Sequence, residues 1–501
     1  RDIKIISENG AEKTIIDGGK NGETVEFRSS TTRDCLLDGF TVTNGGNSDP
    51  ANNGSDGGGI VINGSPTLKN LIIRDNERVE WSGEGIFIVG GGNPLIADCT
   101  IKDNRAHSSS SGVINVYRSS VEFKNCVISN NDGPVMHMGT EDPSTYPANL
   151  IMDNVEVMNH LCVGCGNDAT ISIHNATTTL KNVNIHDNKV GSAINIWRDG
   201  EEAQVELRIE DSDFSRNYAS DGSGGAVQFS NLQLVRILNT TFSSDSSKNG
   251  GGAINSWNTD SLFIDNSTFD GNIALEGNGG AINMSGDENS TLYCEIKNTT
   301  FDKNIGNWGG AIGGFEPIML LLDNVVGTNN TAREGGGFSE YCCGASVKVN
   351  KSTFSNNLAK QGGAINGSKY TLEVVSSNIV DNVVTEKHGA GIHYKKGNGL
   401  IITDSNISRN TGAELGSGLT IANTSKPVTI NNVEFSDNKA GGGGAIYGWY
   451  TNEVSMKNVT FKNNTANQHE GGAILINGSG EDKVYIDSTT FIANVDSTGP
   501  G

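Results

Sequence analysis

Acidic and imidazole side chains are the groups of this chain that could bind calcium or transfer protons. Asp75 and Asp103 occupy equivalent positions in two successive repeats, so stacked repeats would bring both carboxylates to one face. Carboxylate oxygens are ligands that Ca²⁺ prefers, and a lyase would add a basic side chain to abstract a proton. His388 and His393 flank a glycine turn and come closest to a histidine cluster. For all four residues the alternative is a solvated turn surface with no cofactor, and the sequence favours it.

The cysteines raise the question of disulfides. Cys99 and Cys126 each precede an apolar repeat position by two residues, so they lie at the same place in adjacent repeats. Stacking would place their Cα atoms about 4.8 Å apart, within disulfide range, and an unbonded pair of core thiols is the alternative. Cys162 and Cys165 form a single CxxC. A local or cross-coil disulfide, a zinc site and inert thiols all remain open for this second pair.

Sites for N-glycosylation follow from asparagine placed two residues before serine or threonine. The pattern permits a glycan but also arises by chance in a chain rich in these residues. The candidate positions are Asn53, Asn239, Asn298, Asn406 and Asn477.

The charge and hydropathy of the chain limit the classes of partner that it could bind. The formal net charge of −22 is spread along the chain, so its surface repels phosphate backbones and we expect no nucleic acid partner. No apolar run of about 18 residues is present to span a bilayer. The chain opens on RDIKIISENG, which lacks the charged and apolar regions of a secretory signal. We therefore expect either that the protein has no export signal or that the signal lies outside these residues.

Two short phrases recur along the chain and show how it is built. The first contains two glycines, an alanine and an isoleucine. Its clearest copies include Gly252-Ala253-Ile254, Gly280-Ala281-Ile282, Gly310-Ala311-Ile312, Gly363-Ala364-Ile365, Gly444-Ala445-Ile446 and Gly472-Ala473-Ile474. The second is an apolar anchor, two variable residues and an asparagine. Its clearest copies pair Phe269 with Asn272, Phe301 with Asn304, Phe354 with Asn357, Phe435 with Asn438 and Phe461 with Asn464.

The apolar anchors define a period of about 28 residues on average. They are Ile73, Ile101, Ile128, Val157, Ile185, Phe214, Phe242, Phe269, Phe301, Val326, Phe354, Ile379, Ile407, Phe435, Phe461 and Phe491. Within a period, short runs alternate between apolar and polar residues, as strands of three to five residues do. Three strands and their turns fit one coil, and coils would stack in parallel about 4.8 Å apart. We therefore predict an all-β fold, a β-solenoid of about 16 or 17 coils that forms one continuous domain over residues 1–501 of a longer chain.

Glycine and asparagine have distinct expected roles in such a coil. Glycine, at 66 of 501 residues, avoids a Cβ clash where the backbone takes positive φ or where coils approach closely. Asparagine tolerates left-handed turns and can bond its amide to the backbone or to the equivalent asparagine one coil away. The sequence thus predicts glycine corners and an asparagine ladder.

Aromatic residues recur three residues after the isoleucine position. They are Tyr117, Trp197, Trp257 and Trp449. Two interpretations stand, because such rings can form stacking platforms for sugars or cap the core beneath a variable turn. The sequence favours packing.

The pairing of GGA(I/L/V) with FxxN in one repeat resembles the polymorphic outer-membrane proteins of chlamydiae. These belong to the right-handed parallel β-helix, pectate-lyase-like superfamily. The resemblance covers about residues 40–495 and rests on the copies named above. It implies a single right-handed parallel β-helix and a role as an exported adhesin.

Two classes of function follow from this reading. The first is an extracellular or cell-surface structural protein, either an adhesin or a building block of an extracellular filament, with itself, other surface proteins or glycans as partners. The second is a polysaccharide lyase or hydrolase of the same fold. Asn258-Thr259-Asp260 resembles the first motif of polygalacturonases, but the motifs that should follow are missing. The sequence favours the first class and does not separate adhesin from filament.

Overall fold

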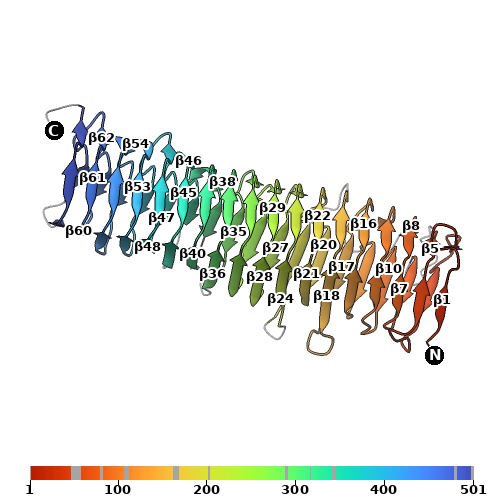
Figure 1. Ribbon diagram of the computed structural model, residues 1–501. Coiled ribbons are helices and arrows are strands. Elements are labelled where there is room, and N and C mark those ends of the chain that lie inside the picture. The colour runs from red at the N-terminus through yellow and green to blue at the C-terminus, as the bar shows by residue number, and fades with distance from the viewer. Residues whose placement is uncertain are drawn as a thin grey trace. The chain divides into compact units, whose positions relative to one another are not determined.

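The computed structural model describes residues 2–46, 58–78, 83–106, 112–161, 169–200, 204–287, 291–315, 318–340, 346–478 and 482–497. The chain divides into two compact units, Arg1–Ser247 (unit 1) and Lys248–Gly501 (unit 2). Each unit is a parallel β-solenoid (Figure 1), and the described residues contain strands and turns but no helix. The described residues make about 16 turns of about 28 residues each. The predicted fold class is confirmed, whereas continuity as one domain stays a prediction.

One coil of unit 2 shows the local rules. It comprises β55 (Leu419–Ala422), β56 (Val428–Asn431), β57 (Glu434–Ser436) and β58 (Lys439–Gly442), and β59 (Ile446–Trp449) opens the next coil. Side chains alternate along β56, whose two apolar residues are buried while the polar ones face outward. The sequence predicts three strands per coil, and the fourth strand was missed because its sequence, KAGG in β58, does not alternate between apolar and polar residues.

The strands that follow the glycine turns stack into one sheet in each unit, the glycine-turn sheet. In unit 1 it contains β3 (Val25–Phe27), β6 (Ile60–Ile62), β10 (Ile86–Val89), β14 (Ile114–Tyr117), β17 (Met136–Gly139), β20 (Ile171–His174), β23 (Ile194–Trp197) and β27 (Val227–Ser230). In unit 2 it contains β31 (Ile254–Trp257), β35 (Ile282–Ser285), β39 (Ile312–Phe315), β43 (Phe338–Glu340), β47 (Ile365–Ser368), β51 (Ile392–Lys395), β55, β59 and β63 (Ile474–Asn477). Isoleucines of successive glycine turns pair in register, as Ile254 does with Ile282, so these turns share one face.

The two glycines of each turn serve different purposes. Gly251 adopts φ +60°, a left-handed conformation that favours glycine. Gly252 has an ordinary φ, but a Cβ there would lie 2.2 Å from the carbonyl oxygen of Gly280 in the next coil. The alanine that follows continues the ladder, since the Ala253 amide donates to the Ala281 carbonyl at 3.0 Å. Both reasons for glycine that the sequence suggests therefore apply: positive φ at the first glycine and close approach of the coils at the second.

The apolar anchors form the core of a second sheet. The Phe269 and Phe301 rings stack with centroids 4.8 Å apart. One predicted anchor, Val326, is wrong by one residue, because Phe301 pairs in register with Gly327 and Val326 is 38% exposed. The Phe354 ring fills the space, since a Cβ on Gly327 would lie 2.7 Å from its Cδ1. A neighbouring ring therefore replaces the missing anchor.

The asparagines of the second phrase form buried ladders. The Asn410 backbone amide and Nδ2 donate to Asn438 Oδ1 at 3.1 and 3.0 Å, and the same Nδ2 donates to the Ile379 carbonyl at 2.9 Å. Each amide thus joins three coils and satisfies buried backbone groups. The expectation that this asparagine itself takes the left-handed turn is wrong, because the preceding residue does so, as Asp437 shows with φ +57°.

Candidate binding groove on the glycine-turn sheet

Unit 2 carries a groove across the outer side of its glycine-turn sheet. It has a volume of about 490 Å³ and is lined by residues that include Gln361, His388, His393, Tyr447 and Trp449. A second depression of about 510 Å³ shares Tyr447 and Leu415 with it. We call the two together the glycine-turn groove.

The floor of the groove is a row of equivalent residues on successive strands. His393 pairs in register with Thr420, and Thr420 pairs with Tyr447. Each follows an inward-facing aliphatic residue, so strand alternation turns these three side chains outward. Leu475 continues the row in the next coil. One floor residue is therefore presented per coil.

Two further rows flank the floor. On one side, His388 forms a parallel bridge with Leu415. On the other side, Lys395 pairs in register with Ala422, and Ala422 pairs with Trp449. The groove is thus built by the fold itself and crosses the strands along the stacking direction.

The two histidines are packed against the groove rather than solvated. His393 is 4% exposed, and its Nδ1 lies 2.8 Å from Asn366 Oδ1 and 3.1 Å from Gln361 Nε2. Burial lowers the pKa of His393 to about 3 and also lowers the pKa of His388. Both rings are consequently neutral at neutral pH. The expectation of a solvated turn is wrong for His393, which lies in β51.

Aromatic side chains form the exposed rim. Trp449 and Tyr450 are 45% and 46% exposed, and their ring centroids are 5.3 Å apart. Trp197 in unit 1 behaves differently, because it is half-buried and stacks on His174 with centroids 5.2 Å apart. Packing therefore describes Trp197, whereas Trp449 leaves nearly half of its surface exposed, as a stacking platform requires.

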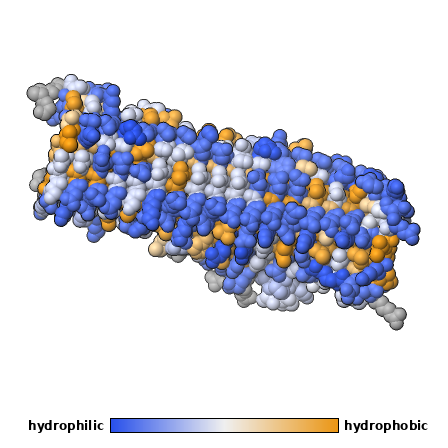
Figure 2. Space-filling model, in the orientation of Figure 1, coloured by the Kyte–Doolittle hydropathy of each residue, from blue (hydrophilic) through white to orange (hydrophobic). Residues whose placement is uncertain are grey.

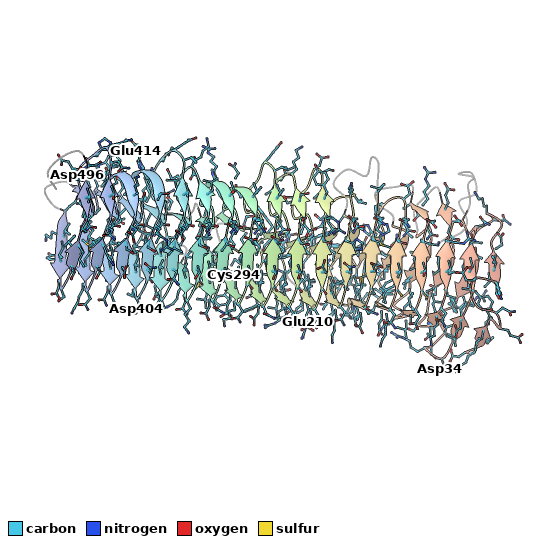
Figure 3. All side chains as sticks on the ribbon, turned by 45° about the horizontal axis from the view of Figure 1, so that its top comes forward. Asp34, Glu210, Cys294, Asp404, Glu414 and Asp496 are labelled. Atoms are coloured by element: carbon cyan, nitrogen blue, oxygen red, sulfur yellow. The ribbon has the colours of Figure 1, made fainter. Side chains whose placement is uncertain are left out.

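Charged groups in the groove nearly balance. Lys387, Lys395 and Glu414 line its first part, and Glu470 lines its continuation. Figure 3 shows Glu414 at the outer edge of unit 2, in contrast to Cys294, which lies between the sheets and is fully buried. Amides, neutral imidazoles and open aromatic faces suit hydrogen bonding and stacking more than proton transfer.

The carboxylates singled out for calcium lie in unit 1, outside this groove. The Asp75 carboxylate contacts the Arg74 guanidinium, and Asp103 Oδ2 lies 3.7 Å from Lys102 Nζ. The described ranges contain no group of three or more His, Cys, Asp or Glu side chains arranged to hold a metal ion. A structural calcium ion shared by Asp75 and Asp103 stays a prediction.

Of the two alternatives for Cys99 and Cys126, the structure has the unbonded thiols. Both are buried and free. They are neighbours because Thr100 pairs in register with Val127. The Leu71 amide donates to Cys99 Sγ at 3.4 Å, and burial raises the pKa of the Cys99 thiol. Cys162 and Cys165 lie outside the described residues.

Of the described glycosylation candidates, Asn239 and Asn298 lie in turns, whereas Asn406 and Asn477 lie at the ends of β53 (Asn406–Ser408) and β63. Asn239, Asn298 and Asn477 are exposed and Asn406 is half-buried, while Asn53 lies outside the described residues. Asn298 has φ +48°, and its Nδ2 donates to Asp265 Oδ1 one coil away at 2.8 Å. Such outer turns need asparagine for their conformation and bonding, which gives this sequon a structural reason. Glycosylation itself stays a prediction.

The tripeptide Asn258-Thr259-Asp260 is a connection between β31 and β32 (Ser261–Asp265). Asn258 has φ +46°, and Thr259 Oγ1 donates to the Trp257 carbonyl at 3.3 Å. Turn geometry therefore explains two of its three residues without catalysis.

Several groove residues were not predicted from the sequence. Gln361, Glu414, Leu415 and Thr420 belong to no repeated phrase, because outward positions vary freely from coil to coil. Their offsets from the glycine turn are the available signal. Tyr447, for example, directly follows the isoleucine of its turn, as His393 does.

Comparisons with known proteins agree with the architecture. The family model described as the right-handed beta helix region matches residues 14–208 and 360–491, which together exceed half of the chain. The model for the Chlamydia polymorphic membrane protein repeat matches residues 351–368, which include Phe354, Asn357 and the glycine turn at 362–365. No curated protein and no solved structure matches the chain. In the described part of the chain, no helix has the length and apolar character to cross a membrane.

Proposed function

Because the chain belongs to the right-handed β-helix family, we propose that it is an extracellular or cell-surface protein of adhesin type that binds a partner without catalysis. The glycine-turn groove is the observation that carries this proposal. It combines an open aromatic rim at Trp449 with neutral His388 and His393 side chains. Similarity to the Chlamydia polymorphic membrane protein repeat supports the surface location.

The interior of each unit supports a scaffolding role. Asparagine ladders and stacked rings connect coil to coil, so the outward rows keep fixed relative positions within a unit. Repeat proteins bind through such extended surfaces, because each coil contributes one member of every row. Groove residues would therefore be held ready without rearrangement.

Self-association into a filament is the second candidate. On the outward side of β36 (Leu292–Lys297) and β40 (Ile318–Asp323), Tyr293 and Met319 pair in register and are 39% and 51% exposed. Figure 2 shows hydrophobic residues distributed over a mostly hydrophilic surface. Neighbouring exposed apolar side chains of this kind suit contact with a second copy.

Antibody labelling of intact and permeabilised cells of the source organism tests the proposed location. We expect equal labelling of both, since an exposed protein needs no permeabilisation to be reached. Labelling that appears only after permeabilisation would contradict the proposed function.

A further inference from the structure

We propose that the glycine-turn groove binds a neutral oligosaccharide that runs across the strands, with one sugar ring on the Trp449 indole. This rests on the proposed function of a partner-binding surface protein and names the class of partner. Three features of the groove favour such a ligand: its spacing, the chemistry of its lining and its charge.

The spacing of the groove suits a polymer with a short repeat. His393, Thr420 and Tyr447 lie on adjacent paired strands, and paired strands are about 4.8 Å apart. A pyranose ring in an extended glycan is of similar length. The floor side chains are buried, with Thr420 only 1% exposed, so each successive sugar would lie over one coil and meet the rows that flank the floor. About four sugars would span the coils from Gln361 to Trp449.

The lining offers what a sugar ring requires. A pyranose has a flat C–H face and a rim of hydroxyl groups, and it needs an aromatic surface beside hydrogen-bonding side chains. Trp449 is 45% exposed and supplies the surface. His388 Nδ1 is buried, and no described residue satisfies it. Gln361 Nε2 is engaged with His393 and Asn366, and its Oε1 adds an acceptor on the same side.

The charge favours a neutral ligand over an acidic one. The two lysines of the groove are offset by Glu414 and Glu470. The whole chain carries −22, so an acidic glycan would approach against long-range repulsion with little compensation in the groove. A neutral glycan incurs no such penalty.

Binding of the purified 501-residue chain to immobilised oligosaccharides tests the proposal. The probes are neutral oligomers of glucose, galactose and N-acetylglucosamine, from one to six sugars, and matched oligomers of uronic acids. We expect binding to neutral oligomers that strengthens up to about four sugars. The variant Trp449→Ala should weaken it at least tenfold, and His388→Ala several-fold.

Trp257→Ala is the matched control, because Trp257 occupies the equivalent strand position, is 49% exposed and does not line the groove. It should bind like the wild type, and circular dichroism confirms that all variants fold. Equal binding by Trp449→Ala, preference for uronic acids, or binding to no oligomer would overturn the inference. If no oligomer binds but intact cells are labelled, a protein partner fits instead and the proposed function stands.

Discussion

At the scale of single residues, two positions of the asparagine ladder hold another residue, His160 and Asp245. They show which hydrogen bonds the asparagine amide provides at the other positions. His160 reproduces both functions, because its Nδ1 lies 3.3 Å from the donating Asn131 amide and its Nε2 lies 3.1 Å from the Ile128 carbonyl. Asp245 reproduces the acceptor role, since its Oδ1 accepts from the Asn217 backbone amide and Nδ2, both at 2.9 Å, whereas the donor role of the amide requires its carboxyl group to be protonated. Both substitutions should make stability depend on pH.

Asp245→Asn should stabilise the protein, and more so at high pH. Burial raises the pKa of Asp245 to about 8, well above its value in the unfolded chain. Its ionisation therefore opposes folding increasingly as pH rises from about 4 to about 8. We expect a gain in unfolding free energy on the order of a few kcal/mol at pH 8 and less at pH 5. Urea unfolding at both pH values measures it.

Asp34→Asn serves as the control for this change, because Asp34 is exposed in the same unit and does not contribute to the raised pKa of Asp245. It should alter stability little at either pH. A loss of stability in Asp245→Asn at pH 8 would show that the carboxylate is not the unfavourable group.

His160→Asn should make the protein more resistant to acid. Burial lowers the pKa of His160 to about 4, below the unfolded value of about 6.5. The stability that the neutral ring provides is present above the unfolded pKa and is lost as pH falls through about 4. At pH 4 the wild type should lose up to about 3 kcal/mol more than the variant, relative to pH 7. Parallel thermal melts at the two pH values would refute this if both proteins lost the same amount.

At the scale of elements, the glycine turn controls how closely coils stack. The second glycine of each turn faces the backbone of the next coil, and Gly444 is typical, since a Cβ there would lie 2.2 Å from the Gly472 carbonyl oxygen. Backbone cannot rotate away as a side-chain tip can. At Gly444 a side chain would therefore separate two coils, whereas the turns before Ile392 and Leu419 hold the small residues Ala390 and Ser417 at the equivalent position.

Gly444→Ala should destabilise unit 2 by about 2–4 kcal/mol through this overpacking. Gly222→Ala is the matched control, because Gly222 has no positive φ and its Cβ would meet only the Ala219 Cβ at an ordinary 3.6 Å. Denaturant unfolding followed by circular dichroism measures both variants. Equal effects of the two changes would mean that close approach of the coils is not the reason for the glycine.

At the scale of the whole molecule, charge and exposed apolar surface oppose each other. The net charge of −22 keeps copies apart, while the paired Tyr293 and Met319 side chains, 39% and 51% exposed, offer apolar contact. Salt screens the charge repulsion between copies, because the Debye length falls from about 10 Å at 0.1 M to about 3 Å at 1 M. It does not weaken the apolar contact. Association should therefore increase with ionic strength.

The double variant Tyr293→Lys, Met319→Lys should remain monomeric where the wild type associates at high salt. Sedimentation velocity over a series of protein concentrations measures this. Ile151→Lys is the control, since Ile151 is also an exposed apolar residue, at 41%, but lies in unit 1. A wild type that is monomeric throughout would remove the support for a filament.

The sequence by itself determined the repeat and therefore the fold. Inward residues and glycine corners recur because each must match the coil above and below, so their spacing is visible without coordinates. The anchor was assigned wrongly to Val326, because the true anchor position holds Gly327 and the neighbouring Phe354 ring fills the space over it. The repeat period does not show that a residue of one coil fills the core position of another. The left-handed residue before each asparagine was likewise assigned to the wrong position, since several residue types adopt that conformation here.

Only the tertiary structure determined the groove. His393, Thr420 and Tyr447 share no residue type and lie roughly one repeat apart in sequence, yet strand register places them in one row. Outward positions face solvent, so packing does not constrain their identity and no repeated pattern identifies them. Register converts equal offsets from the glycine turn into neighbours in space, and that step requires the stacked coil.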